Sequence, residues 1–189
     1  MDAVVLYSGG KDSSLAAYIL ERTGYDVSLL TANFGVLDSG KHAKKAAEAI
    51  GMPHEIQRFD TAVMKKACEM IAKDGFPKNG INFLHRYVIE EVAKEHGVIA
   101  DGTRRDDRVP WLDLRAIRSI EDSCGMEYLA PLRGIGSRTV KKLSEKLFEI
   151  EKVESGTQNS DYESEAREML KSKLDIFPSH TQSRVKWRL

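Results

Sequence analysis

The residues best suited to chemistry follow the first apolar run of the chain, in the segment Ser8-Gly9-Gly10-Lys11-Asp12-Ser13-Ser14. The glycines allow a sharp turn close to a ligand, and free N–H groups at the start of a helix favour a bound phosphate. The Lys11 ammonium group and the hydroxyl groups of Ser8, Ser13 and Ser14 add donors for phosphate oxygens. A bare phosphate would repel Asp12, so we expect this carboxylate to act through Mg²⁺. The alternative, an ordinary turn with Asp12 as helix N-cap, leaves most of these features unexplained.

The elements around this segment alternate between strand and helix. Residues 3–7 (AVVLY) form a continuous apolar run, typical of a strand buried on both faces, and residues 12–23 gather apolar side chains on one helical face. Further strands are predicted, with helices between them, at 27–34, 54–59, 98–100 and 127–130. This alternation predicts an α/β fold, a Rossmann-like parallel five-stranded sheet with helices on both faces.

The segment 8–13 resembles the SGGxDS signature of the PP-loop ATP pyrophosphatases, also called adenine nucleotide alpha hydrolases. The resemblance covers roughly residues 1–135 and includes a second region, 100–107 (ADGTRRDD), where the family has a small residue, a glycine and acidic residues at a strand end. It implies a HUP-type sheet that binds ATP at its carboxyl edge. It also implies that a substrate oxygen attacks the α-phosphate, so that pyrophosphate leaves and an adenylated intermediate remains.

The residue chemistry is consistent with such a reaction, because displacement at phosphorus needs positioning and charge neutralisation more than covalent help. We expect Asp12 with Asp106 or Asp107 to hold a Mg²⁺ ion that bridges phosphates, and we assign Asp12 and Asp106 as the metal ligands and Asp107 as a catalytic carboxylate. Lys11, Arg104 and Arg105 would offset the charge on departing pyrophosphate. Ion pairs of the two arginines with Asp106 and Asp107 are the alternative. The spacing leaves open which arginine faces the phosphates.

The nucleoside is expected next to two strand ends. In the family, the backbone at the end of the second strand contacts adenine, and this corresponds here to residues 31–34. Phe34 could stack on the base, although a Phe at a strand end is more often part of the core. Gly102 and Thr103 complete the expected ATP-binding set. A second loop, 35–42 (GVLDSGKH), nearly matches a Walker A motif, but His42 at its last position cannot place a hydroxyl group on Mg²⁺.

The chain changes character after Pro131, and we divide it into an ATP-binding α/β domain, 1–135, and a helical C-terminal extension with a basic tail, 136–189. Helices are predicted at 139–151 and 163–174, with a polar linker at 155–160 (SGTQNS). The extension is too short for a core of its own. Its tail holds Arg184, Lys186, Trp187 and Arg188 without an acidic residue, which suits RNA and equally suits docking on a neighbouring subunit.

Cysteine usage bears on sulfur transfer, because many relatives in this superfamily thiolate tRNA with a persulfide-carrying cysteine or an iron–sulfur cluster. The stretch before the long helix often reads CxxC in such enzymes, and here it is 77–80 (PKNG). We expect Cys68 to be buried, and Cys124 is the better candidate for a sulfur carrier, although a structural role is favoured for both. A separate donor would supply sulfur or ammonia, since the chain has no recognisable glutaminase or rhodanese segment.

Two further groups of basic residues are weaker candidates. His85 and Arg86 lie on the predicted long helix 82–96, where they would face an anionic substrate or simply the solvent. After the fifth strand, four basic residues would contact phosphate or the acceptor, or form an ordinary charged helix face: Arg133, Arg138, Lys141 and Lys142.

Composition narrows the class of function without identifying a substrate. In 189 residues, 29 Lys and Arg balance 29 Asp and Glu, which argues against bulk electrostatic attraction to nucleic acid. No apolar run approaches the roughly 20 residues of a membrane span and no secretory signal is present, so we expect a cytoplasmic protein without a membrane partner.

We predict an ATP-dependent adenylating enzyme that forms AMP and pyrophosphate. It would activate an oxygen of an acceptor, tRNA or a small molecule, for attack by a nitrogen or sulfur nucleophile. A homodimer would join two basic surfaces for RNA. A small-molecule amide ligase and a non-catalytic ATP-binding sensor or subunit are the alternatives.

Overall fold

The computed structural model describes residues 1–38, 40–153, 160–171 and 182–189. Five strands form a parallel sheet in the order β3-β2-β1-β4-β5: β1 (Asp2–Leu6), β2 (Asp26–Asn33), β3 (His54–Arg58), β4 (Val98–Ala100) and β5 (Glu127–Leu129). The predicted α/β fold with a five-stranded parallel sheet is therefore confirmed.

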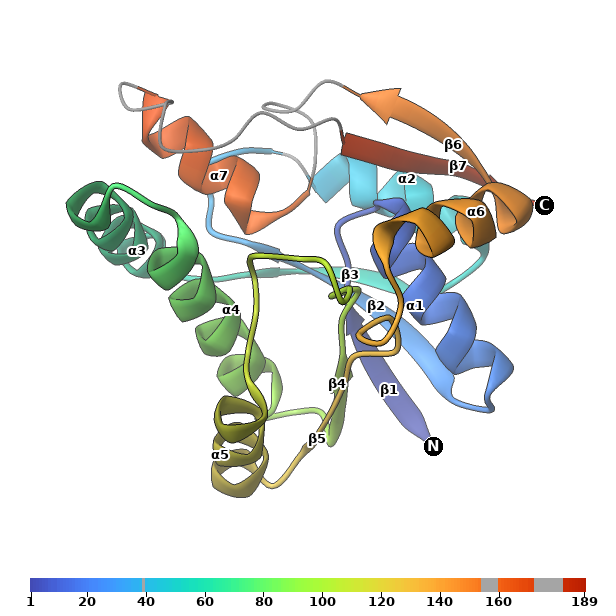
Figure 1. Cartoon of the computed structure of the whole chain (residues 1–189), viewed down its shortest axis with the longest axis horizontal. Helices are drawn as coiled ribbons and strands as arrows, with labels where there is room; N and C mark the ends of the chain where they lie inside the picture. Colours follow the sequence, from blue (N-terminus) through green and yellow to red (C-terminus); the bar gives the residue numbers. More distant parts are fainter. Residues whose placement is uncertain (39, 154–159, 172–181) are drawn as a thin grey trace.

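Helices cover both faces of this sheet (Figure 1). One face carries α1 (Lys11–Arg22), α2 (Gly40–Ile50) and α6 (Ser137–Leu147), and the other carries α3 (Thr61–Asp74), α4 (Lys78–Val92) and α5 (Leu114–Cys124). Each face has its own apolar cluster. Neighbouring residues of β2 illustrate the division, because Leu29 belongs to the cluster under α1 and α2 whereas Leu30 belongs to the cluster under α3 and α4. In the described parts of the chain, no helix has the length and apolar character to cross a membrane.

The strand order reverses between β1 and β4, which pair in parallel with Val5 opposite Ala100. The chain leaves β1 toward β2 on one side and returns to β4 on the other. Loops at the carboxyl ends of the two strands therefore diverge and leave a crevice, where open α/β sheets bind ligands. The loop 8–14 follows β1 and the segment 101–107 follows β4, so the fold itself brings the two candidate regions together.

The C-terminal extension is not purely helical, in contrast to the prediction. The helix predicted at 139–151 ends at Leu147, and β6 (Phe148–Val153) pairs antiparallel with β7 (Gln182–Arg188), the segment expected to be a basic tail. Phe148 and Val185 bury their side chains in the cluster under α1 and α2, so each strand is stabilised by distant residues that a local pattern does not reveal. Helix α7 (Tyr162–Met169) packs on α3 and α4. The predicted linker lies almost wholly outside the described residues.

Candidate nucleotide-binding site

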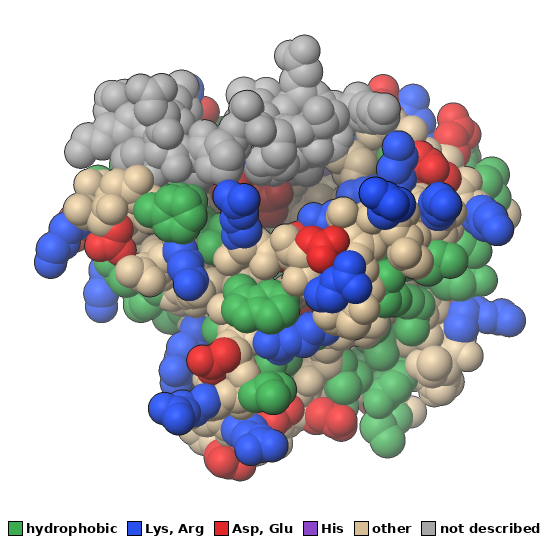
Figure 2. Space-filling model, in the orientation of Figure 1, with side chains coloured by type: hydrophobic (Ala, Val, Ile, Leu, Met, Phe, Trp, Pro, Cys, Tyr) green, Lys and Arg blue, Asp and Glu red, His purple; other side chains and the backbone are tan. Residues whose placement is uncertain are grey.

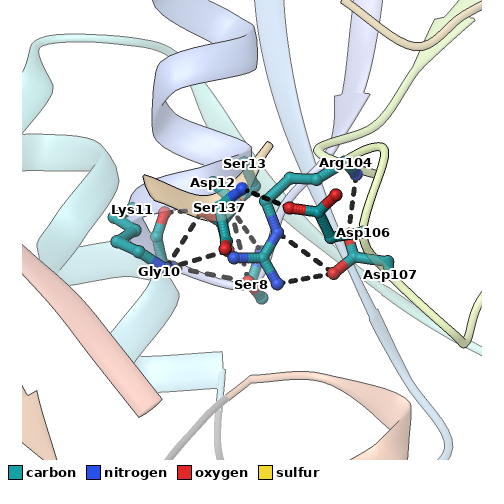
Figure 3. Close-up of polar contacts among 9 residues, drawn as sticks. All are labelled: Ser8, Gly10, Lys11, Asp12, Ser13, Arg104, Asp106, Asp107 and Ser137. Atoms are coloured by element: carbon teal, nitrogen blue, oxygen red, sulfur yellow. Dashed lines mark hydrogen bonds and ion pairs between the residues drawn. The ribbon is translucent and has the colours of Figure 1, made fainter. Parts of the chain in front are cut away.

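The loop 8–14 connects β1 directly to the first turn of α1. Gly9 has φ of 77°, and a Cβ atom there would lie 3.1 Å from Cα of Ala43 in α2, so the turn needs glycine. The Ser13 hydroxyl group donates to the carbonyl of Gly10 (3.2 Å) and lies 3.3 Å from the Ser8 hydroxyl oxygen (Figure 3). Ser14 is buried and hydrogen-bonded to the Tyr7 hydroxyl group (3.0 Å), so it supports the loop from beneath.

The segment after β4 packs directly on this loop. A Cβ atom at Gly102 would lie 2.6 Å from the Ser13 nitrogen and 2.7 Å from the Asp12 carbonyl carbon, and both neighbours are backbone atoms. Only glycine allows this approach without a shift of one of the two segments. The structure thus brings together the two regions that the sequence singled out.

The two predicted arginines have different positions. Arg104 bridges two carboxylates: its Nη1 lies 3.7 Å from Asp12 Oδ2, and its Nε donates to Asp107 Oδ1 at 3.0 Å (Figure 3). Burial by itself disfavours the charged guanidinium, but the hydrogen bond to Asp107 and the charge of Asp12 raise the pKa of Arg104. Arg105 is 63% exposed and pairs with Asp106 (3.0 Å). Lys11 Nζ lies 3.0 Å from the Asp12 carboxylate.

Asp106 has a different neighbourhood from Asp107. Its carboxylate accepts hydrogen bonds from the backbone N–H of Ser137 at the start of α6 (2.8 Å) and from Arg105, and these bonds lower its pKa. Asp107 lines the cavity described below with Asp12, whereas Asp106 is not among the lining residues. Asp106 therefore joins α6 to the segment after β4. Within the described ranges, no three His, Cys, Asp or Glu side chains are grouped as a protein-only metal site.

A cavity of about 190 Å³ opens at the carboxyl ends of β1 and β4. Its apolar part includes Leu6, Leu30, Ala32, Ile81 and Pro110. Polar groups come from the loop after β1, from α4, from the segment after β4 and from the residues at the start of α7: Ser8, Asp12, Ser13, His85, Asp101, Gly102, Thr103, Asp107, Ser160, Asp161, Tyr162 and Glu163. An apolar wall with converging polar groups suits a small polar ligand that has one flat apolar part.

Phe34 does not face this cavity. Its ring is fully buried and packs on Phe59, with 5.5 Å between ring centroids. Its backbone N–H donates to Glu165 Oε2 of α7 (2.9 Å). The apolar cluster under α3 and α4 is the better environment for the ring, so its predicted stacking on the base is not seen. Of residues 31–34, only Ala32 lines the cavity.

Neither cysteine lines the cavity. Cys68 lies in α3 with its sulfur 4.0 Å from the carbonyl oxygen of Ala166, and burial raises the pKa of its thiol to about 11. Cys124 is the last residue of α5, just before β5 begins, so it lies at the amino edge of the sheet, opposite the loop after β1. Neither cysteine therefore lies where it could carry sulfur to a ligand in the cavity.

A buried polar network beside the cavity has little signal in the sequence. Asp101 accepts hydrogen bonds from the Thr103 N–H and hydroxyl groups (both 2.9 Å) and from the Tyr128 hydroxyl group (2.5 Å). His85 Nε2 lies 2.9 Å from Asp101 Oδ2, and His85 Nδ1 is hydrogen-bonded to the Tyr162 hydroxyl group. By sequence, His85 is only a minor candidate, and Tyr162 carries no local signal because α7 has to dock before it reaches α4.

The C-terminal extension contacts the site at two further points. The N–H of Val185 in β7 donates to the carbonyl of Gly9 (3.1 Å), inside the candidate phosphate loop. Glu165, 1% exposed, accepts the N–H groups of Phe34 and Val36 (both 2.9 Å) and of Leu37 (3.3 Å). The extension thus supports the loops after β1 and β2.

The predicted basic residues are partly engaged. Arg188 pairs with Glu21 (2.7 Å) and Lys186 with Glu151 (3.5 Å), while Trp187 of the same strand is exposed. Arg133 stacks on Trp111 at 4.4 Å from the ring centroid. The other three predicted basic residues, Arg138, Lys141 and Lys142, are exposed on α6. Figure 2 shows Lys and Arg side chains spread over this face of the molecule, with carboxylates between them.

Comparison with known proteins assigns the chain to a family. The model described as "Family of unknown function (DUF7411)" matches residues 1–187. A solved structure from Methanocaldococcus jannaschii, described as a "predicted subunit of tRNA methyltransferase", is 41% identical, with a TM-score of 0.92 over 100% of this chain and 98% of that chain. A tRNA-5-methyluridine(54) 2-sulfurtransferase of Pyrococcus horikoshii is 31% identical over 58% of this chain and 37% of that protein.

A more distant solved structure shares the fold alone. It is a 4-thiouridine synthetase in complex with RNA and bound ATP, with a TM-score of 0.54 and 22% identity over 77% of this chain and 40% of that chain. The chain thus spans less than half of the length of the sulfurtransferase and of the synthetase. Because the family model spans nearly the whole chain and the SGGxDS loop lies at the reversal of the same parallel sheet, the chain belongs to the DUF7411 family within the PP-loop ATP pyrophosphatase superfamily.

Proposed function

We propose that the chain is an ATP-dependent adenylating enzyme that modifies tRNA and releases pyrophosphate. The observation that carries the proposal is the backbone contact between Gly102 and the loop after β1, because it brings the candidate phosphate loop and Asp107, the partner of Arg104, to one cavity. Membership of the PP-loop ATP pyrophosphatase superfamily supports ATP as the nucleotide. The name of the Pyrococcus relative supports tRNA as the acceptor.

The cavity and the loop suit the two parts of ATP. Leu6, Leu30 and Ile81 offer an apolar surface for the base, and the hydroxyl group of Thr103 lies at the same wall. The free N–H groups and positive end of α1 suit the phosphates. Phosphate oxygens would attract Lys11 Nζ away from Asp12, its present partner.

Two carboxylates fit a magnesium ion that travels with ATP. Asp12 and Asp107 line the cavity and would hold the ion, which takes its other oxygen ligands from phosphates and water, the usual pattern for Mg²⁺. Once bound, Mg²⁺ neutralises charge on the phosphates. We assign this role to Asp107 in place of Asp106, because Asp107 lines the cavity and Asp106 does not.

The reaction needs an acceptor oxygen in line with the α-phosphorus. As pyrophosphate leaves, negative charge grows on it, and we assign Arg104, which pairs with Asp12 of the loop, to offset this charge together with Lys11. Asp107 fixes the guanidinium through the backbone N–H and the side chain of Arg104 (2.7 and 3.0 Å), so little reorganisation is needed during the reaction. A preorganised donor of this kind contributes about 10²–10³ to the rate.

A second candidate is an ATP-binding subunit without chemistry of its own. The similar structure from Methanocaldococcus, described as a predicted subunit, favours it. The two candidates differ in the fate of bound ATP, since a subunit would keep ATP intact.

The test uses ATP labelled in the α-phosphate, Mg²⁺ and unfractionated tRNA, with nucleotides separated by chromatography. The wild type should form AMP, and tRNA should stimulate it. Asp12→Asn should lower AMP formation by at least about 10²-fold, because the metal and phosphate contacts are weakened. Asp26→Asn is the matched control, an exposed carboxylate at the amino edge of the sheet, and should behave like the wild type.

Each other product pattern contradicts a part of the proposal. ADP would exclude attack at the α-phosphorus. AMP that a small-molecule extract stimulates and tRNA does not would exclude tRNA as the acceptor. ATP that binds but stays intact, both with tRNA and with the small-molecule extract, would favour the ATP-binding subunit.

A further inference from the structure

Three side chains from three separate elements form a hydrogen-bonded chain along the wall of the cavity. Asp101 follows β4, His85 lies in α4 and Tyr162 begins α7, and all three line the cavity. His85 Nε2 lies 2.9 Å from Asp101 Oδ2, and the side chains of these two residues are 2% and 6% exposed. His85 Nδ1 is hydrogen-bonded to the hydroxyl group of Tyr162, the outermost member of the chain.

The hydrogen bonds around Asp101 define which group carries which proton. Burial alone favours the neutral acid, but hydrogen bonds from His85, Tyr128 and Thr103 outweigh it and lower the pKa of Asp101. The ionised Asp101 accepts the proton on Nε2 of the His85 imidazole, which leaves Nδ1 as the acceptor of the Tyr162 hydroxyl proton. Burial raises the pKa of Tyr162, so the resting hydroxyl group stays protonated.

We propose that Tyr162, His85 and Asp101 form a proton relay that accepts a proton from an ammonium ion, the nitrogen nucleophile that displaces AMP from the adenylated acceptor. This inference rests on the proposed function and names the class of its nucleophile. The order carboxylate, imidazole, hydroxyl is also that of the serine hydrolase triad, where the imidazole acts as base and the carboxylate stabilises the imidazolium. Here the tyrosine hydroxyl group transfers a proton and forms no covalent bond.

A proton relay is more useful in the displacement of AMP than in the adenylation step. It is also more useful for a nitrogen nucleophile than for a sulfur nucleophile. A carbonyl-type oxygen that attacks ATP has no proton to lose, whereas ammonium has to lose one before it can attack. Hydrogen sulfide already exists in substantial part as the hydrosulfide anion at neutral pH, and this anion needs no base. Neither Cys68 nor Cys124 lies at the cavity to carry a persulfide.

The proposed step balances in protons and electrons. One ammonium proton passes to the Tyr162 oxygen as the Tyr162 proton passes to His85 Nδ1, and Asp101 stabilises the imidazolium. The ammonia so formed attacks the carbon that carries the adenylate oxygen: a C–N bond forms, and the C–O bond breaks with its electron pair leaving on AMP. The new C–N group sheds a proton to solvent, and the relay resets by releasing its own.

A purely structural role for the same contacts would hold α7 against α4. However, α7 has other anchors, since Glu165 accepts three backbone N–H groups from residues 34–37 and Ala166 is buried in the apolar cluster under α3 and α4. Tyr162→Phe keeps the ring and these anchors, so we expect the variant to fold. Tyr25→Phe is the matched control, because Tyr25 lies in the turn before β2 at the amino edge of the sheet.

The experiment uses the full chain with unfractionated tRNA, and compares two half-reactions. Exchange of labelled pyrophosphate into ATP reports adenylation, and AMP release with ammonium chloride reports displacement. Tyr162→Phe should slow ammonium-dependent AMP release about 10²–10³-fold more than it slows the exchange of pyrophosphate. Hydroxylamine, which is uncharged at neutral pH, should restore release to within about tenfold of wild type, because it needs no deprotonation before attack. His85→Gln should show the same selectivity.

Several outcomes would overturn the relay. If Tyr162→Phe slowed AMP release equally with ammonium and with hydroxylamine, Tyr162 would be a structural residue. The same conclusion would follow if the variant lost pyrophosphate exchange to the same extent as AMP release. Wild type that exchanges pyrophosphate but releases AMP with sulfide and not with ammonium would exclude the nitrogen nucleophile. Absence of exchange in wild type would defeat the proposed function and the relay with it, so the two failures are distinguishable.

Discussion

The sheet unit (residues 1–135) and the C-terminal extension (136–189) contribute to one cavity by different physical means. In the sheet unit, helices such as α1 and α4 bury an apolar face against strands that are close in sequence, and the two apolar clusters follow. In the extension, Val140, Phe148, Ala166 and Val185 join these same clusters, and the described elements in addition bind to distant backbone: Val185 to Gly9, and Glu165 to residues 34–37.

This difference shows how a short extension without a core of its own takes part in a site. It hydrogen-bonds to backbone groups of the loops after β1 and β2 that have no partner within the sheet, and α7 supplies Tyr162 to the cavity wall. The sheet unit positions the loop after β1, and the extension completes its surroundings. Three variants separate these contributions.

The largest effect is expected from Gly102→Ala in the sheet unit. Its Cβ would meet the backbone of residues 12 and 13 at 2.6–2.7 Å, so a segment of the site has to move. We expect a loss of about 3 kcal/mol in the free energy of unfolding, together with weaker ATP binding, measured by urea denaturation and calorimetry. Gly134→Ala, whose Cβ meets nothing within 4 Å, should change neither quantity. Unchanged stability in Gly102→Ala would contradict the close contact of the two regions.

The next effect is expected from Glu165→Ala in the extension. The change leaves the N–H groups of Phe34, Val36 and Leu37 without their acceptor, at a cost of about 2 kcal/mol. Hydrogen exchange of these amides should accelerate, whereas the amides of β1 should be unaffected. Glu168→Ala on the same helix removes only a partly exposed pair with Lys171 and should cost less than about 0.5 kcal/mol. Protection of residues 34–37 in Glu165→Ala would show that the extension is not their partner.

The smallest effect concerns acid stability and the network that joins both regions. The folded-state pKa of Asp101 is lowered, so its stabilisation is fully present above about pH 4, the ordinary Asp value, and is lost as pH falls through the folded-state pKa. Asp101→Asn should flatten the stability curve below pH 4 by at most about 1.4 kcal/mol per pH unit. Tyr162→Phe should retain the slope, because His85, Tyr128 and Thr103 from the sheet unit carry the shift. Urea denaturation between pH 3 and 6 would measure how the free energy of unfolding depends on pH. Equal slopes in Asp101→Asn and wild type would contradict the lowered pKa of Asp101.

Much of the sheet unit was predictable because its signals are local. The apolar run before Ser8, the glycine pair and the amphipathic segment after Asp12 together define the loop after β1 and its surroundings. The contact of residues 8–14 with residues 101–107 also followed, since carboxyl ends of parallel strands meet at one edge. The sequence did not predict that Asp107, and not Asp106, lines the cavity, because this depends on the hydrogen bond of Asp106 with Ser137 at the start of α6.

The sequence by itself determined the fold class, the superfamily and the place of the SGGxDS loop between β1 and α1, because each depends on patterns within one or two adjacent elements. Only the tertiary structure decided that Phe34 belongs to the core, that Cys124 lies at the opposite edge and that β7 supports Gly9. It alone brought Tyr162 to His85, two residues 77 positions apart in the chain. Such contacts depend on how distant segments dock, and a hydrogen bond between partners far apart in sequence leaves no periodic trace in either one.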